Sequence, residues 1–262
     1  MDGKGGLSQS SVRQAHAVLH KALRCAMKWG FVFRNVGDAT EPPRARSKEP
    51  SVPNEATVAK LIGSLGDSRL QAPTLVAVAT GLRRGELLGL TWANIDFANG
   101  AVSVIRSLEE TNEAGLVLAE TKTKSSRRVV AVPRSVMDSL RRHKVRQGEL
   151  RLALGPAYQD SDLVFPAEDG SFWRPSTFSR EFAKAVSNAG LNMRFHDLRH
   201  ACATILMRQG VHPKIVSERL GHSTVGITLN LYSHVTPDMQ REAADQLEKS
   251  CQGFDLVRRC SV

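Results

Sequence analysis

Hydrophobic residues recur every three or four positions over most of the chain, a spacing that is typical of amphipathic helices. Along residues 8–34 the apolar positions fall on one helical face, with basic residues between them and Ser10 or Ser11 as the cap. Glycine and proline residues punctuate the later apolar stretches. These stretches predict helices over residues 54–66, 70–80, 83–92, 134–152, 175–189, 196–209 and 213–220, and a polar helix after Pro237.

Three runs rich in β-branched residues break the helical spacing, at 101–107, 116–121 and 127–133. Because turn residues separate them, they predict a small antiparallel meander, with residues 122–126 as the hairpin turn between the last two strands. The expected fold class is therefore mainly α with a small antiparallel β-sheet, an α+β protein.

Composition narrows the class of protein. Hydrophobic residues make up 41% of the 262, and no apolar run is long enough to span a bilayer. The first residues lack the apolar segment of a secretory signal, so we expect a cytoplasmic protein without a membrane partner. The four cysteines are scattered without CxxC spacing, which argues against a disulfide framework or a cysteine-based zinc site.

The net charge of +10 favours a polyanionic partner, and nucleic acid is the first candidate. Residues 1–53 carry nine Lys and Arg against four Asp and Glu, and nine minus four leaves five, half of the excess. The long helix in this region cannot bury its apolar stripe alone. We therefore interpret residues 1–36 as the last part of a helical DNA-binding domain.

The stretch 36–53 contains four prolines and mixed charge, a composition that favours an extended, weakly structured linker. The predicted division is a DNA-binding part over 1–36, a linker over 37–53, a main domain over 54–245 and a C-terminal tail over 246–262.

Candidate chemistry gathers in the segment that begins FHDLRH. His196 and Arg199 are three residues apart, so on a helix they face the same way and can direct two donors at one target. His196 also stands near a helix N-terminus, where backbone amides favour an anion. Donors and cations beside a nucleophile suit a phosphoryl group whose charge grows in the transition state. The remaining members of such a set are Arg83, Lys122, His222 and Tyr232.

Other interpretations exist for the same residues. His196 and His200 are four apart and could bind a metal, but HDLRH lacks the Glu of a zinc-protease helix and places Arg199 where a cation would be repelled. Arg83 and Glu86 are also typical of a solvated helix face, and Lys122 of an ordinary turn. The chain has no carboxylate cluster suited to Mg²⁺ and no GxxxxGK[ST] loop, so we expect phosphoryl transfer without metal or cofactor.

Four stretches of the chain, given at the end of this paragraph in sequence order, resemble the motifs of the tyrosine recombinase, or phage integrase, family. The resemblance covers about residues 50–240, and more weakly the helix over 8–34. It implies the catalytic-domain fold of that family, preceded by the C-terminal part of a core DNA-binding domain. The four stretches are ATGLRRGELLGLTW (79–92), TKTKSSRRVVAVP (121–133), HDLRH (196–200) and LGHSTVGITLNLYSHV (220–235).

The resemblance also implies a role for each matching residue. Tyr232 would be the nucleophile, and Lys122, with Lys124 as the fallback, would protonate the leaving 5′ oxygen. Glu86 would support the first arginine. The residues that would bind the scissile phosphate are Arg83, His196, Arg199 and His222.

The implied function is site-specific recombination, in which DNA is cleaved and rejoined through a 3′-phosphotyrosine link without metal or ATP. The partner would be double-stranded DNA at attachment-type sites, bound by a homotetramer, and the resemblance allows a DNA-bending accessory protein. An integrase of a phage or other mobile element fits best, and a chromosome-dimer resolvase is an alternative role. A type IB topoisomerase would share this chemistry. A non-catalytic DNA-binding remnant of an integrase would fit the short helical region before the linker.

Overall fold

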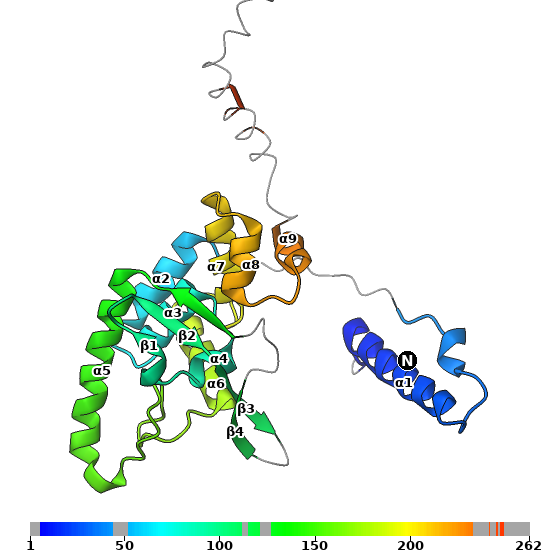
Figure 1. Ribbon diagram of the computed structural model, residues 1–262, viewed down its shortest axis with the longest axis horizontal. Coiled ribbons are helices and arrows are strands. Elements are labelled where there is room, and N and C mark those ends of the chain that lie inside the picture. The colour runs from blue at the N-terminus through cyan, green and yellow to red at the C-terminus, as the bar shows by residue number, and fades with distance from the viewer. Residues whose placement is uncertain are drawn as a thin grey trace, which may run out of the picture. The chain divides into compact units, whose positions relative to one another are not determined.

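The computed structural model describes residues 6–43, 52–111, 115–120 and 127–232, together with positions 241, 245, 247 and 248. The chain divides into two compact units, residues 1–51 and 52–262, and each is described by itself (Figure 1). In the described part of the chain, no helix is both long and apolar enough to cross a membrane.

The first unit is built on helix α1 (Gln9–Lys28). Its cap is Ser8, whose hydroxyl accepts a hydrogen bond from the Ser11 backbone N–H, so the predicted caps at Ser10 or Ser11 are wrong by two or three positions. The helix ends at Lys28 rather than at residue 34, because the backbone turns to a positive φ of 77° at Gly30. None of its side chains is buried.

A short 3₁₀ helix, η1 (Val36–Ala39), corrects the prediction of an extended chain from residue 36 onward. Nε2 of His20 lies 2.5 Å from Oδ1 of Asp38, and Nε2 of His16 lies 3.3 Å from the carbonyl oxygen of Gly37. These contacts tie the start of the predicted linker back to α1.

Helices dominate the described part of the second unit, and most of them begin and end where the sequence pattern predicts. Oδ1 of Asn54 accepts a hydrogen bond from the Thr57 N–H at 2.8 Å and caps α2 (Glu55–Leu65). The C-cap residues Gly81 of α3 and Gly221 of α8 are left-handed. The helices after α2 are α3 (Gln71–Thr80), α4 (Arg84–Leu88), η2 (Trp92–Asn94), α5 (Arg134–Leu154), η4 (Gly155–Ala157), α6 (Pro175–Asn188), α7 (Asp197–Arg208), α8 (Pro213–Leu220) and α9 (Val225–Tyr232).

The strands pair differently from the predicted meander. The run 101–107 is divided at Ile105 into two strands, β2 and β3, which join different sheets. One sheet has the order β1-β2-β5 and the other is the hairpin β3-β4, all antiparallel. Because β4 pairs with β3 and β5 pairs with β2, these two strands do not form the predicted hairpin. Its predicted turn at 122–126 lies outside the described residues. The strands are β1 (Ile95–Asp96), β2 (Ala101–Val104), β3 (Arg106–Thr111), β4 (Gly115–Glu120) and β5 (Arg128–Ala131).

The main hydrophobic core joins α2, α3, α5 and α6 to the sheets. At its centre the Phe195 ring meets the rings of Phe178 and Phe182 edge to face, with centroids 5.0 and 5.2 Å apart. Such aromatic pairs stabilise a core beyond the area that they bury. A smaller cluster, which includes Met207 and Leu220, packs α7 against α8.

Helix α4 lies directly on strand β3 because its facing residues are glycines. A Cβ atom at Gly85 would stand 2.8 Å from the carbonyl oxygen of Leu108, and one at Gly89 would stand 2.9 Å from the Leu108 nitrogen. The four-residue spacing places both glycines on one side of the helix. This close approach sets the position of α4, and with it that of the residues at its N-terminus.

We expect Gly85→Ala to lower the free energy of unfolding by about 1–3 kcal/mol, since the added methyl group would overlap strand backbone that cannot move aside. The matched control is Gly63→Ala, at an exposed site in α2 where an added Cβ meets nothing within 4 Å. That change should stabilise the protein by about 0.5–1 kcal/mol, because alanine is the better helix former. Urea unfolding of both variants decides the matter, and equal effects would contradict the close packing of α4.

Candidate functional site

Arg83 stands at the N-terminus of α4, where it is the extended N-cap residue and not part of the helix. Its backbone N–H donates to Oε2 of Glu86 at 2.9 Å, and its Nη1 donates to Oε1 at 2.8 Å. Nη2 donates to the carbonyl oxygen of Gly221 at 3.0 Å, which connects α4 to the end of α8. The side chain is still 42% exposed, so it remains accessible to a ligand.

The carboxylate of Glu86 is buried and binds a second arginine, Arg128 on β5. Nη2 of Arg128 donates to Oε2 at 2.8 Å and Nη1 donates to Oε1 at 3.2 Å. Burial alone would raise the pKa of Glu86, but the hydrogen bond and charge of Arg128, with those of Arg83, outweigh it and lower the pKa. Glu86 is therefore ionised at neutral pH and is shared by two cations.

Arg128 was not among the residues predicted from the sequence. A signal for it does exist, because residues alternate between the two faces of a strand. Val130 and Val132 are buried, so Arg128 lies on the same inward side, while Arg127 and Val129 face outward. An inward-facing arginine requires a buried acceptor.

Arg199 comes from the first turn of α7 and is only 4% exposed. Its Nη1 donates to the carbonyl oxygen of Gly81 at 2.7 Å. Its Nη2 is buried and has no hydrogen-bond partner among the residues that the structure describes. Burial and the neighbouring charge of Arg83 lower the pKa of this guanidinium to about 9, so it stays positively charged at neutral pH.

His222 follows Gly221 directly, and its Nδ1 lies 2.8 Å from the hydroxyl of Thr228 on α9. Burial, together with the charges of Arg199 and Arg83, lowers the pKa of His222 to about 4. The imidazole is therefore neutral at pH 7. If the Thr228 hydroxyl donates to Nδ1, the opposite nitrogen carries the proton and can donate to a ligand.

His196 is the N-cap residue of α7, and its ring meets that of His200 edge to face with centroids 4.8 Å apart. Burial, followed by the nearby His200, Arg199 and Arg83, lowers the pKa of His196. Within the described residues, no group of three or more His, Cys, Asp or Glu side chains is gathered to hold a metal ion. The environment of both histidines is cationic, which disfavours a metal ion there.

The structure thus brings together five of the predicted site residues: Arg83, Glu86, His196, Arg199 and His222. Tyr232 is the last residue of α9, which packs against α7 and α8. Lys122 and the fallback Lys124 lie outside the described residues.

This cluster is suited to an anion because its positive charges exceed its negative ones. Arg83, Arg128 and Arg199 surround one carboxylate, that of Glu86. Partly buried cations and neutral imidazole donors fixed in this way are the groups that stabilise growing charge on a phosphoryl oxygen.

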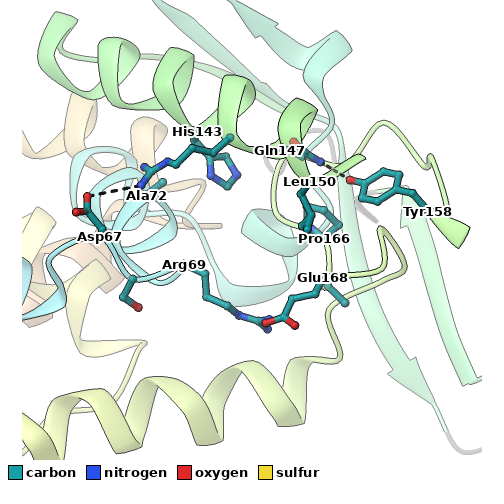
Figure 2. A pocket seen from close by; sticks show the side chains of 12 residues that line it. Asp67, Arg69, Ala72, His143, Gln147, Leu150, Tyr158, Pro166 and Glu168 are labelled. Atoms are coloured by element: carbon teal, nitrogen blue, oxygen red, sulfur yellow. Dashed lines mark hydrogen bonds and ion pairs between the residues drawn. The ribbon is translucent and has the colours of Figure 1, made fainter. Parts of the chain in front are cut away.

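A pocket away from this cluster, between α5 and residues 67–72 and 158–168, has no such excess of positive charge (Figure 2). It holds about 200 Å³ and has two arginines in its lining, each of which is paired. Arg69 forms ion pairs with Glu168 and Glu181, and Arg146 lies 3.7 Å from Asp67. Since these charges are already compensated, the pocket is a weaker candidate for an anion than the arginine cluster.

Comparisons with known proteins show what the chain is similar to. The model of the phage integrase family matches residues 55–239. A tyrosine recombinase XerC-like protein of Caldanaerobacter subterraneus is 33% identical over 92% of this chain, and the ICEBs1 integrase of Bacillus subtilis is 31% identical over 93%. The chain spans 66% of the length of each of these two relatives.

A solved structure, the Tn1549 transposon integrase in complex with a circular intermediate DNA, matches with a TM-score of 0.78 and 21% identity. The match covers 92% of this chain and 80% of that one. This likeness establishes the fold, an α+β tyrosine recombinase fold, as the sequence motifs predict.

The low pKa of His222 can be observed directly by NMR titration of its imidazole. Without DNA, we expect its midpoint near pH 4, because burial disfavours the charged imidazole and protonation would add a charge beside two arginines. His222→Gln identifies the resonance by removing it. Inorganic phosphate should raise the midpoint, since a bound anion favours the charged imidazole. A midpoint near 6.5, the ordinary value for histidine, that phosphate does not move would contradict the cationic site.

Proposed function

Because the chain belongs to the phage integrase family, we propose that it is a tyrosine-type site-specific recombinase. It cleaves and rejoins double-stranded DNA through a 3′-phosphotyrosine intermediate, without metal or ATP. The observation that carries the proposal is the buried Arg199, whose Nη2 has no partner among the described residues. A buried cation without a carboxylate partner opposes folding, so its presence is best explained by an anion that binds there.

In the proposed reaction each residue of the cluster has one task. Arg83 and Arg199 bind the two non-bridging oxygens of the scissile phosphate, and His196 and His222 donate further hydrogen bonds as neutral imidazoles. Glu86 holds the first arginine in place. These contacts strengthen as the phosphorus becomes pentacovalent, because the charge on its oxygens grows.

The nucleophile in this proposal is Tyr232, and the general acid is Lys122. The phenol of Tyr232 releases its proton to solvent water and its oxygen bonds to phosphorus, while the bond from phosphorus to the 5′ oxygen breaks. Lys122 gives a proton to the departing 5′ oxygen. The phosphotyrosine link keeps the energy of the broken bond, so attack by a 5′ hydroxyl of another strand restores the DNA backbone without ATP.

The net charge of +10 supports DNA as the partner. A pocket of about 450 Å³ beside His196 is lined by Arg84 and Arg194, and we infer that the phosphates next to the scissile one lie along it. Strand exchange requires two duplexes, so we further propose a homotetramer on attachment-type sites in the cytoplasm, with a DNA-bending accessory protein as an optional partner. Residues 1–36 are proposed to bind the duplex together with the catalytic domain, and residues 37–53 to link the two.

Covalent cleavage is the first testable consequence. The protein is mixed with nicked duplexes that carry the DNA flanking its own gene, in EDTA, and the products are separated on a denaturing gel. We expect a protein–DNA band that Tyr232→Phe abolishes while DNA binding in a gel shift is unchanged. A gel shift without any covalent band would support a non-catalytic DNA-binding protein, and a band that persists in the Phe variant would exclude Tyr232.

A second consequence separates function from stability at Arg199. We expect Arg199→Met to lower cleavage by about a hundredfold or more, because one phosphate donor is lost. The same variant should be as resistant to urea as the wild type or more resistant, because an unpaired buried cation is replaced by an apolar side chain of similar length. The matched control is Arg208→Met, at the exposed end of the same helix. A destabilised Arg199→Met that still cleaves would identify Arg199 as a structural residue.

A further inference from the structure

Arg128 is a buried arginine at the start of β5 to which the proposed reaction gives no task. Its side chain is 6% exposed, whereas that of its neighbour Arg127 is 55% exposed and pairs with Glu120. The strand alternation that buries Val130 turns Arg128 toward α4 and α8. It begins β5 immediately after the segment that contains Lys122.

The contacts of Arg128 close a ring through three elements. Two of its nitrogens bind the carboxylate of Glu86 on α4, and its Nε donates to the carbonyl oxygen of Arg219 at 2.7 Å. Two residues beyond Arg219, the carbonyl oxygen of Gly221 accepts from Arg83, which itself binds Glu86. Each link therefore limits the position of the next, from β5 through α4 to the end of α8.

The charges in this ring decide how strongly Arg83 can bind an anion. Oε1 of Glu86 accepts from both Arg83 and Arg128, so the negative charge of one carboxylate is divided between two cations. Without Arg128, the whole carboxylate would face Arg83 and form a neutral pair with it. That pair would compete with a phosphate for the same guanidinium.

We propose that Arg128 is a positioning residue. By sharing the charge of the Glu86 carboxylate, it prevents Glu86 from fully neutralising Arg83, so that Arg83 stays available to the scissile phosphate. This inference rests on the proposed function, and it deepens the account of the same site. Arg128 itself does not touch the phosphate. Its effect passes through Glu86, and it should therefore vanish when the side chain at position 86 carries no charge.

The test is a double-mutant cycle between positions 128 and 86. Arg128→Lys is preferred to a larger change, because it keeps a positive charge beside Glu86 and so preserves the fold. A lysine cannot form the bidentate pair or the bond to the Arg219 carbonyl. We expect Arg128→Lys to lower single-turnover cleavage on saturating suicide DNA by about tenfold. In the Glu86→Gln background the same change should cost less than about threefold.

The matched control is Arg127→Lys, at the exposed residue that directly precedes β5, which should cleave like the wild type in either background. Urea unfolding of every variant checks the fold. A merely structural role would give equal losses with Glu86 intact and in the Glu86→Gln background, and that result would overturn the inference. So would full activity of Arg128→Lys with Glu86 intact.

Inorganic sulfate provides a readout that does not depend on cleavage. Sulfate should raise the unfolding temperature of the wild type by mass action. The increase should be smaller in Arg128→Lys and restored in Arg128→Lys with Glu86→Gln. If the wild type forms no covalent product, the proposed function fails, and the sulfate series alone decides the role of Arg128. Equal sulfate effects in all variants would then refute it.

Discussion

The organisation of the site depends on one buried carboxylate, that of Glu86, which is shared by two arginines. Arg83 approaches it from the N-terminus of α4 and Arg128 from β5, and both guanidinium groups donate to its Oε1. The pairing fixes both arginines at little cost in unpaired charge, since each donates to a fully ionised acceptor. It also leaves an excess of positive charge, because Arg199 adds a third cation and no further carboxylate is bound to it among the described residues. The site is therefore built to be completed by an anion.

Such a site opposes folding, and the rest of the unit must offset it. Arg199 is buried with one unpaired nitrogen, and the histidines around it have lowered pKa values because their protonation would add to a cationic field. The opposing stability comes from the aromatic core around Phe178 and from the packing of α7 on α8. The pocket in Figure 2 shows the alternative arrangement, in which each lining arginine has a carboxylate partner. A buried arginine without a carboxylate partner is the feature that distinguishes a candidate binding site from a surface with paired charges.

The local sequence pattern predicted most helices of the second unit, because the signals for a helix, its apolar spacing and the glycine or proline at its ends, are contained in one short stretch of chain. Strand pairing was predicted wrongly, since nothing in the run 101–107 shows that it divides at Ile105 and joins two sheets. The same limit explains Arg128. Its partner Glu86 is 42 residues away, so only the inward alternation with Val130 could have indicated a buried charge. Arg83, His196, Arg199 and His222 could be predicted as site residues because they lie in short motifs, whereas their proximity is a property of the folded chain.

Two of those motifs carry a left-handed glycine within two residues of a predicted site residue. Gly81 and Gly221 both end helices in the left-handed conformation, with φ of 66° and 67°. The carbonyl oxygen of each glycine accepts a hydrogen bond from an arginine of the site. Arg199 donates to Gly81, and Arg83, two residues after Gly81, donates to Gly221. A Cβ at Gly81 would stand 2.2 Å from the Leu220 side chain, so the ends of α3 and α8 meet only where one of them has no side chain. The closeness of these two helix ends brings Arg83 and Arg199 together at one site, and each of the two glycines lies within two residues of a predicted site residue, Arg83 or His222.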